Sequence, residues 1–77
     1  MDVFTEIDMF NRMHRLISTN STGAPDEFAH KLGISRWKLY DMIDNMKMIG
    51  APIVYSRISK CFYYTKPFEF NISYSYK

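Results

Sequence analysis

The side chains of this 77-residue sequence that could carry chemistry are mainly cations, and most of them lie in its second half. Residues 1–30 hold two basic and five acidic residues, whereas residues 31–77 hold eight basic and three acidic residues. Arg36 and Lys38 lie close together, and so do Arg57 and Lys60 in a later segment. Guanidinium and ammonium groups gathered in this way attract polyanions. The charge pattern therefore predicts that any surface facing a polyanion lies in the C-terminal half.

Few side chains are placed to catalyse a reaction or to hold a metal ion. His14 and His30 fall on the flanks of predicted helices, and Cys61 lies in an apolar run, where a lone thiol usually fills space. The three glycines form no phosphate-binding loop. We therefore expect a protein that is not an enzyme and that uses neither a metal nor a cofactor.

Cysteine content and hydropathy indicate the cellular compartment in which this protein functions. Cys61 is the only cysteine, so the chain has no internal disulfide and suits a reducing compartment. No apolar stretch approaches the roughly 20 residues of a membrane span, and the first six residues lack the basic start of a signal peptide. We expect a single domain over residues 1–77, in the cytoplasm and without membrane contact.

Apolar residues recur at three- and four-residue steps in three segments, which predicts three helices, at residues 3–18, 25–32 and about 36–49. Gly33 suits the end of the second helix, and the hydroxyl of Ser35 suits the cap of the third. Two helices joined by so short a turn are typical of a helix-turn-helix, here about residues 25–49.

After Gly50 the apolar period changes from helical to two. The β-branched and aromatic runs 53–56 and 61–65 flank the basic segment 57–60, which predicts a hairpin, the candidate wing, over about residues 53–65. In the tail, residues 67–77, apolar and polar side chains alternate, which predicts a third strand with one apolar face. The sequence thus predicts an α+β fold, a winged helix-turn-helix in which three helices precede the hairpin wing.

The third predicted helix has two distinct faces. One sector must face the core and holds Leu39, Met42, Ile43 and Met46. The roughly opposite sector holds Trp37, Asp41, Asp44 and Met48. The start of this helix would meet base edges in the major groove of DNA, where an arginine such as Arg36 can bond a guanine edge with two hydrogen bonds. Lys38 and Tyr40 suit phosphate oxygens.

Two segments carry a family resemblance: residues 32–36, Leu-Gly-Ile-Ser-Arg, and residues 49–53, Ile-Gly-Ala-Pro-Ile, with Leu39, Tyr40 and Ile43 between them. They resemble the N-terminal winged helix-turn-helix of bacterial transcription regulators of the DeoR type, especially those that carry a WYL domain. The segment 55–65 is similar to the wing that follows there. The resemblance implies a recognition helix in the major groove and a wing on the backbone or minor groove. By matching position it implies that DNA is contacted by Ser35, Arg36, Trp37, Lys38, Tyr40, Arg57 and Lys60.

In this sequence no effector or WYL domain follows the wing, so we expect no small-molecule effector. We expect direct occupancy of double-stranded DNA, as a small transcriptional regulator or DNA-accessory factor. The tail strand predicts a homodimer. The alternative, from a different functional class, is a protein-interaction module on the same scaffold, which would bind its partner through the face of Trp37, Asp41, Asp44 and Met48.

Overall fold

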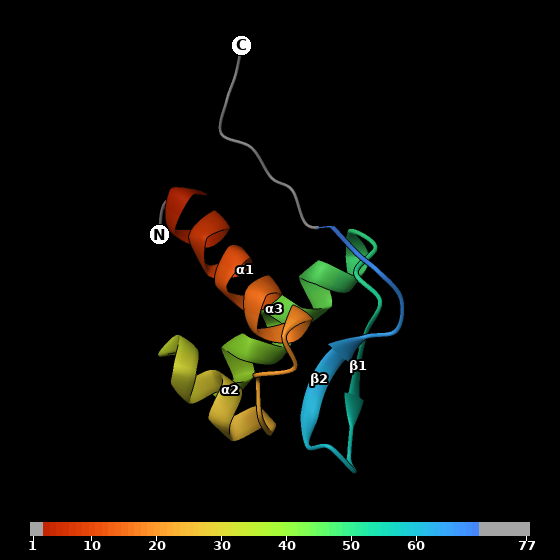
Figure 1. Ribbon diagram of the computed structural model, residues 1–77. Helices are drawn as coiled ribbons and strands as arrows, with labels where there is room; N and C mark the ends of the chain where they lie inside the picture. The colour runs from red at the N-terminus through yellow and green to blue at the C-terminus, as the bar shows by residue number, and fades with distance from the viewer. Residues whose placement is uncertain (1–2, 70–77) are drawn as a thin grey trace.

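The computed structural model describes residues 3–69, and within them the chain is α+β: three helices followed by a two-stranded antiparallel hairpin. The elements are α1 (Val3–Ser18), α2 (Pro25–Leu32), α3 (Arg36–Met48), β1 (Ile53–Ser56) and β2 (Cys61–Tyr64). Figure 1 shows α2 and the hairpin turn at the lower end of the molecule, on opposite sides, with α1 above them. The predicted order of three helices followed by a hairpin is confirmed.

The turn between α2 and α3 has the geometry that its residue types favour. Gly33 is left-handed, with φ 73°, and the Ile34 amide donates to the carbonyl of Ala29 at 3.0 Å. This bond satisfies a carbonyl at the end of α2 that has no partner within the helix. The Ser35 hydroxyl then accepts the Lys38 amide at 3.1 Å, which caps α3 as predicted.

Two predicted boundaries were one residue too long. Ile49 was expected in α3, but it lies just beyond the helix with ψ 13°, and Gly50 follows with φ 102°. Thr65 was expected in the hairpin, but β2 ends at Tyr64. The Thr65 amide still donates to the carbonyl of Pro52 at 2.8 Å, whereas Pro52 has no N–H to return the bond. The ladder therefore stops there.

The core lies between the three helices and one face of the hairpin. The four α3 residues that were predicted to face inward are all at most 3% exposed, which confirms that prediction. From α1, the predicted apolar face supplies Met13 and Ile17 to the core, while Phe10 and Leu16 are half-buried against it. The buried cluster is Met13, Ile17, Phe28, Ala29, Leu32, Leu39, Met42, Ile43, Met46, Ala51, Ile53 and Phe62.

The hairpin is joined to the helices by aromatic packing. The Phe62 ring lies 5.5 Å from that of Phe28 in α2 and 4.9 Å from that of Tyr55 in β1, measured between centroids. Tyr55 and Phe62 are paired in the register, so they point to the same face of the hairpin. One face of the hairpin is therefore part of the core, while on the other face Val54 and Tyr63 are exposed and Cys61 is buried.

A buried hydrogen bond also links the hairpin to the loop between α1 and α2. Thr22 lies in that loop and is fully buried. Its hydroxyl donates to the Gly23 carbonyl at 2.9 Å and accepts the Phe62 amide at 2.9 Å. The Thr65 amide donates to the Pro52 carbonyl, on the side of β1. Backbone amides an odd number of positions apart along a strand point to opposite edges, and Phe62 is three residues from Thr65. The Phe62 amide therefore lies on the outer edge of β2, away from β1. We call this interaction the Thr22–Phe62 link; it fixes the hairpin against the helices.

The predicted C-terminal strand is not present as far as the structure describes the tail. Residues 67–69 are irregular, and the apolar positions Phe70, Ile72, Tyr74 and Tyr76 lie outside the described residues. Phe68 packs on Tyr64, with ring centroids 5.2 Å apart. The homodimer expected from this tail stays a prediction.

Replacing Thr22 tests the link. In Thr22→Val the side chain keeps its shape, but the buried Phe62 amide loses its acceptor, so we expect a loss of about 1–3 kcal/mol in the free energy of unfolding. Thr22→Ser keeps the hydroxyl and loses only a methyl group. Hydrogen exchange monitored by NMR gives the sharper readout, because the Phe62 amide should stay protected in the serine variant and lose protection in the valine variant. Equal protection in both variants would contradict the link.

Candidate nucleic-acid interface

The predicted contact residues at the start of α3 lie at the surface. Trp37 is 77% exposed and Tyr40 41%, and Ser35 and Arg36 are exposed as well. Lys38 is half-buried. The start of α3 therefore presents Arg36 and two aromatic rings to solvent and leaves Lys38 partly exposed.

Arg36 has a partner that the sequence analysis missed. Its Nε lies 3.3 Å from a carboxylate oxygen of Asp26 in the first turn of α2, and its guanidinium carbon lies 5.9 Å from the centre of the Tyr40 ring. A hydrogen bond with Tyr40 and the charge of Asp26 raise the pKa of Arg36 above its ordinary value. Both members of the ion pair are more than half exposed, so the pair adds little stability and can exchange with a competing anion.

The outer face of α3 combines acidic and apolar residues, as predicted. Asp41 and Asp44 are exposed, and Met48 is 83% exposed beyond them. Together with Trp37 they form the face that would bind a partner protein under the alternative prediction. The exposed positive charge of Arg36 is thus in the first turn of α3, and the carboxylates of Asp41 and Asp44 lie farther along the helix.

The hairpin turn, residues 57–60, is exposed at every position and has a well-defined conformation. The Ser56 hydroxyl accepts the Ser59 amide at 3.1 Å, and the Lys60 amide donates to the Ser56 carbonyl at 2.7 Å. Lys60 has φ 57°, in the left-handed region that favours glycine. The turn therefore holds Arg57 and Lys60 on a fixed backbone.

A short chain of interactions connects the two groups of cations. Arg36 is paired with Asp26 in the first turn of α2. The loop that leads into this turn carries Thr22, which is bonded to Phe62 in β2, and Lys60 lies two residues before Phe62.

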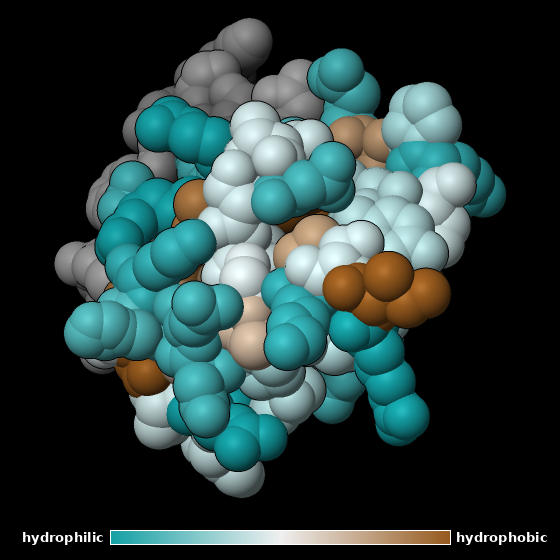
Figure 2. Space-filling model, turned by 60° about the horizontal axis from the view of Figure 1, so that its bottom comes forward, coloured by the Kyte–Doolittle hydropathy of each residue, from teal (hydrophilic) through white to brown (hydrophobic). Residues whose placement is uncertain are grey.

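Figure 2 views the molecule with the end that carries α2 and the hairpin turn brought forward. Hydrophilic side chains cover much of this face, and the most apolar atoms form small, separate groups among them. A large apolar patch of the kind that marks a stable protein interface is therefore not visible on this face.

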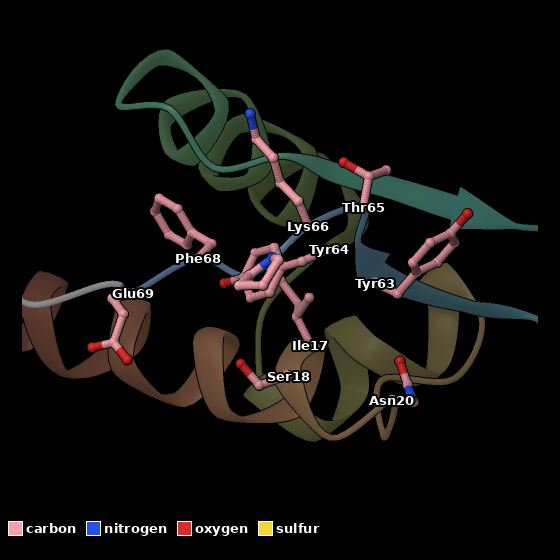
Figure 3. A pocket seen from close by; sticks show the side chains of 10 residues that line it. Ile17, Ser18, Asn20, Tyr63, Tyr64, Thr65, Lys66, Phe68 and Glu69 are labelled. Carbon is pink, nitrogen blue, oxygen red and sulfur yellow. The ribbon is translucent and has the colours of Figure 1, made fainter.

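A shallow hollow lies elsewhere, between the C-terminal end of α1 and β2 with the segment that follows it. It measures about 570 Å³ (Figure 3). Lys66 and Glu69 both line it, but Figure 3 shows their charged groups pointing away from one another. These two residues therefore form no acid–base pair.

Next to this hollow, His14 has a structural role. Its Nδ1 lies 2.8 Å from the Tyr64 hydroxyl, and its ring contacts that of Phe68 at 6.2 Å between centroids. Burial raises the pKa of Tyr64 to about 12, so the hydroxyl keeps its proton at neutral pH and can donate to the imidazole. His14 is half-buried and His30 exposed, as expected for flank positions.

Residues 7–69 hold no group of three or more His, Cys, Asp and Glu side chains that could bind a metal ion. Cys61 is buried with a free thiol, in keeping with its predicted role as a small apolar filler. In the described part of the chain, no helix combines the length and the apolar character needed to cross a bilayer.

Comparison with models of known protein families, with curated proteins and with solved structures finds no significant match to this chain. The function therefore has to be inferred from the arrangement of its own side chains.

The left-handed conformation of Lys60 predicts the effect of a substitution on stability. Lys60→Gly removes the steric penalty of a Cβ at φ 57°, so we expect the free energy of unfolding to rise by about 0.5–1 kcal/mol. Lys60→Ala is the matched control, because it removes the same charge but keeps the Cβ. Urea denaturation measures both. A glycine variant no more stable than the alanine variant would contradict the strained turn.

Proposed function

We propose that this chain is a winged helix-turn-helix protein that binds double-stranded DNA, with α2 and α3 as the helix-turn-helix and the β1–β2 hairpin as the wing. One observation carries the proposal: exposed cations lie both at the capped start of α3 and on the hairpin turn, and the Thr22–Phe62 link bonds the hairpin to the loop before α2. The resemblance to DeoR-type regulators supports the same assignment.

In this proposal α3 enters the major groove by its first turn. The groove is about 12 Å wide and admits a helix. Arg36 and Tyr40 reach base edges or phosphates, and Trp37 packs on sugars or a thymine methyl group. Asp41 and Asp44 lie farther along the exposed face, and their charges repel the backbone. They favour an approach in which the start of the helix leads and exclude one in which the helix lies flat.

Arg36 changes partners on binding. Asp26 holds the guanidinium close to the start of α3, and a phosphate or a guanine edge then replaces the carboxylate. Because the pair is exposed, the exchange costs little, and the ion pair restricts Arg36 to conformations near the groove. Asp26 is thus a positioning residue for Arg36.

The hairpin turn adds the second contact, with Arg57 and Lys60 on backbone phosphates beside the groove that α3 occupies. Two contacts on one rigid body fix the orientation of the protein on the duplex, which a single helix does not. The function that fits best is that of a small transcriptional regulator or DNA-accessory factor. A second copy, paired through the tail, would place two such units on neighbouring half-sites.

Binding to a duplex oligonucleotide should weaken steeply with salt, because Lys and Arg release counterions from the phosphates. Titrations at several salt concentrations, followed by fluorescence anisotropy, measure the slope. Arg57→Ala should lower the slope by about one and weaken binding. Arg36→Ala should cost at least as much affinity. Lys47→Ala, which removes an exposed cation from the last turn of α3, is the control and should change little. Wild-type protein that does not bind duplex at low salt would contradict DNA binding.

Replacing Asp26 tests its competition with DNA. Asp26→Asn removes the carboxylate that pairs with Arg36 and a charge that repels phosphate, so we expect the affinity for duplex DNA to rise about five-fold. Glu69→Gln removes an exposed carboxylate far along the chain and serves as the control. Asp26→Asn also removes a negative charge from the start of α2, where such a charge stabilises the helix. Thermal denaturation of both variants measures this change in stability separately from binding. Unchanged or weaker binding by Asp26→Asn would show that Asp26 does not compete.

The second candidate function is binding of a partner protein through the outer face of α3. The high exposure of Trp37 and Met48 favours it, because large apolar residues at the surface are enriched in protein interfaces. The two functions differ in their response to Trp37→Ala and Met48→Ala. Loss of a protein complex in both variants, with no duplex binding by the wild type at low salt, would favour the second candidate.

A further inference from the structure

Ile58 is the most exposed large apolar residue that the structure describes. It is 96% exposed, in the middle of the hairpin turn. Turns of this kind favour Gly, Asn, Asp and Ser, whose conformations and hydrogen bonds suit them. A β-branched apolar residue contributes nothing to the fold at such a site, because it touches almost no other part of the protein. The side chain is therefore available to contact a partner.

The backbone around Ile58 holds the side chain outward. The Ser56 hydroxyl accepts the Ser59 amide, and the two hydroxyls lie 3.2 Å apart, which braces the turn from within. Lys60 completes it in a left-handed conformation that a lysine adopts only at a cost. Unfavourable residue choices at two of four positions in one turn indicate selection for something other than stability.

The neighbours of Ile58 identify the chemistry of its partner. Arg57 precedes it, Lys60 follows two residues later, and both are exposed. An apolar tip between two cations matches the minor groove of DNA, which is about 6 Å wide and has a phosphate backbone on each side. Apolar side chains placed there pack between base steps and bend the duplex. One isoleucine offers too little apolar area to anchor a protein in a bilayer by itself.

We propose that Ile58 is an apolar wedge that the hairpin turn inserts into the minor groove next to the major-groove site of α3, with Arg57 and Lys60 on the flanking phosphates. This inference rests on the proposed DNA binding and adds its minor-groove contact. It implies that the protein bends DNA and prefers sites with a deformable pyrimidine–purine step under the hairpin turn.

The test uses the full chain and short duplexes that carry a donor and an acceptor dye at their two ends. Affinity comes from anisotropy and bending from energy transfer. Ile58→Thr should bind about ten-fold more weakly and lose most of the change in energy transfer. Ile58→Val should behave as the wild type. Val54→Thr is the matched control, because Val54 is the other exposed aliphatic residue of the hairpin, at 37%, but lies away from the turn.

The outcomes separate the wedge from DNA binding as such. If Ile58→Thr binds and bends the duplex as the wild type does, the wedge is wrong and DNA binding stands. If the wild-type protein does not bind any duplex, both proposals fail. If the wild type instead binds vesicles of phosphatidylcholine and phosphatidylserine, and Ile58→Thr abolishes only that, the turn is a membrane contact and the wedge is again wrong.

Discussion

The position of the hairpin depends on the Thr22–Phe62 link. Besides this link, the hairpin is held by the short connection after α3, by the packing of Phe62 on Phe28 and by the hydrogen bond between His14 and Tyr64. A buried hydroxyl that accepts the outer-edge amide of β2 adds a directional constraint that apolar packing lacks, and it gives the Phe62 amide an acceptor. The same loop leads into the α2 turn that carries Asp26. The hairpin is therefore bonded to the loop that precedes the residue paired with Arg36.

Local sequence preferences are satisfied at the turn between α2 and α3 but not at the hairpin turn. Ser35 caps α3, and Gly33 takes the left-handed position that ends α2. In the turn, by contrast, Lys60 is left-handed and Ile58 is almost fully exposed. Natural sequences tend to depart from local rules at functional sites. Because of this contrast, we propose that the turn contacts DNA through Ile58 in addition to attracting phosphates through Arg57 and Lys60.

Much of the fold follows from short-range patterns. Apolar spacing and cap residues fixed all five elements to within a residue, and the inward face of α3 was predicted because helical geometry alone determines it. The contacts that organise the candidate site could not be found in this way. Thr22 and Phe62 lie 40 residues apart, and His14 and Tyr64 lie 50 apart. The Asp26–Arg36 pair depends on how α2 crosses α3, which no periodicity encodes.

The central claim is that the start of α3 and the hairpin turn bind one duplex together. Chemical-shift mapping tests it most directly, by adding an unlabelled DNA duplex to ¹⁵N-labelled protein and following each backbone amide. We expect the largest changes in residues 35–40 and 57–60, and we expect both sets to grow in parallel with the same affinity. Changes confined to one of these segments, or centred on Asp44 and Met48, would contradict it.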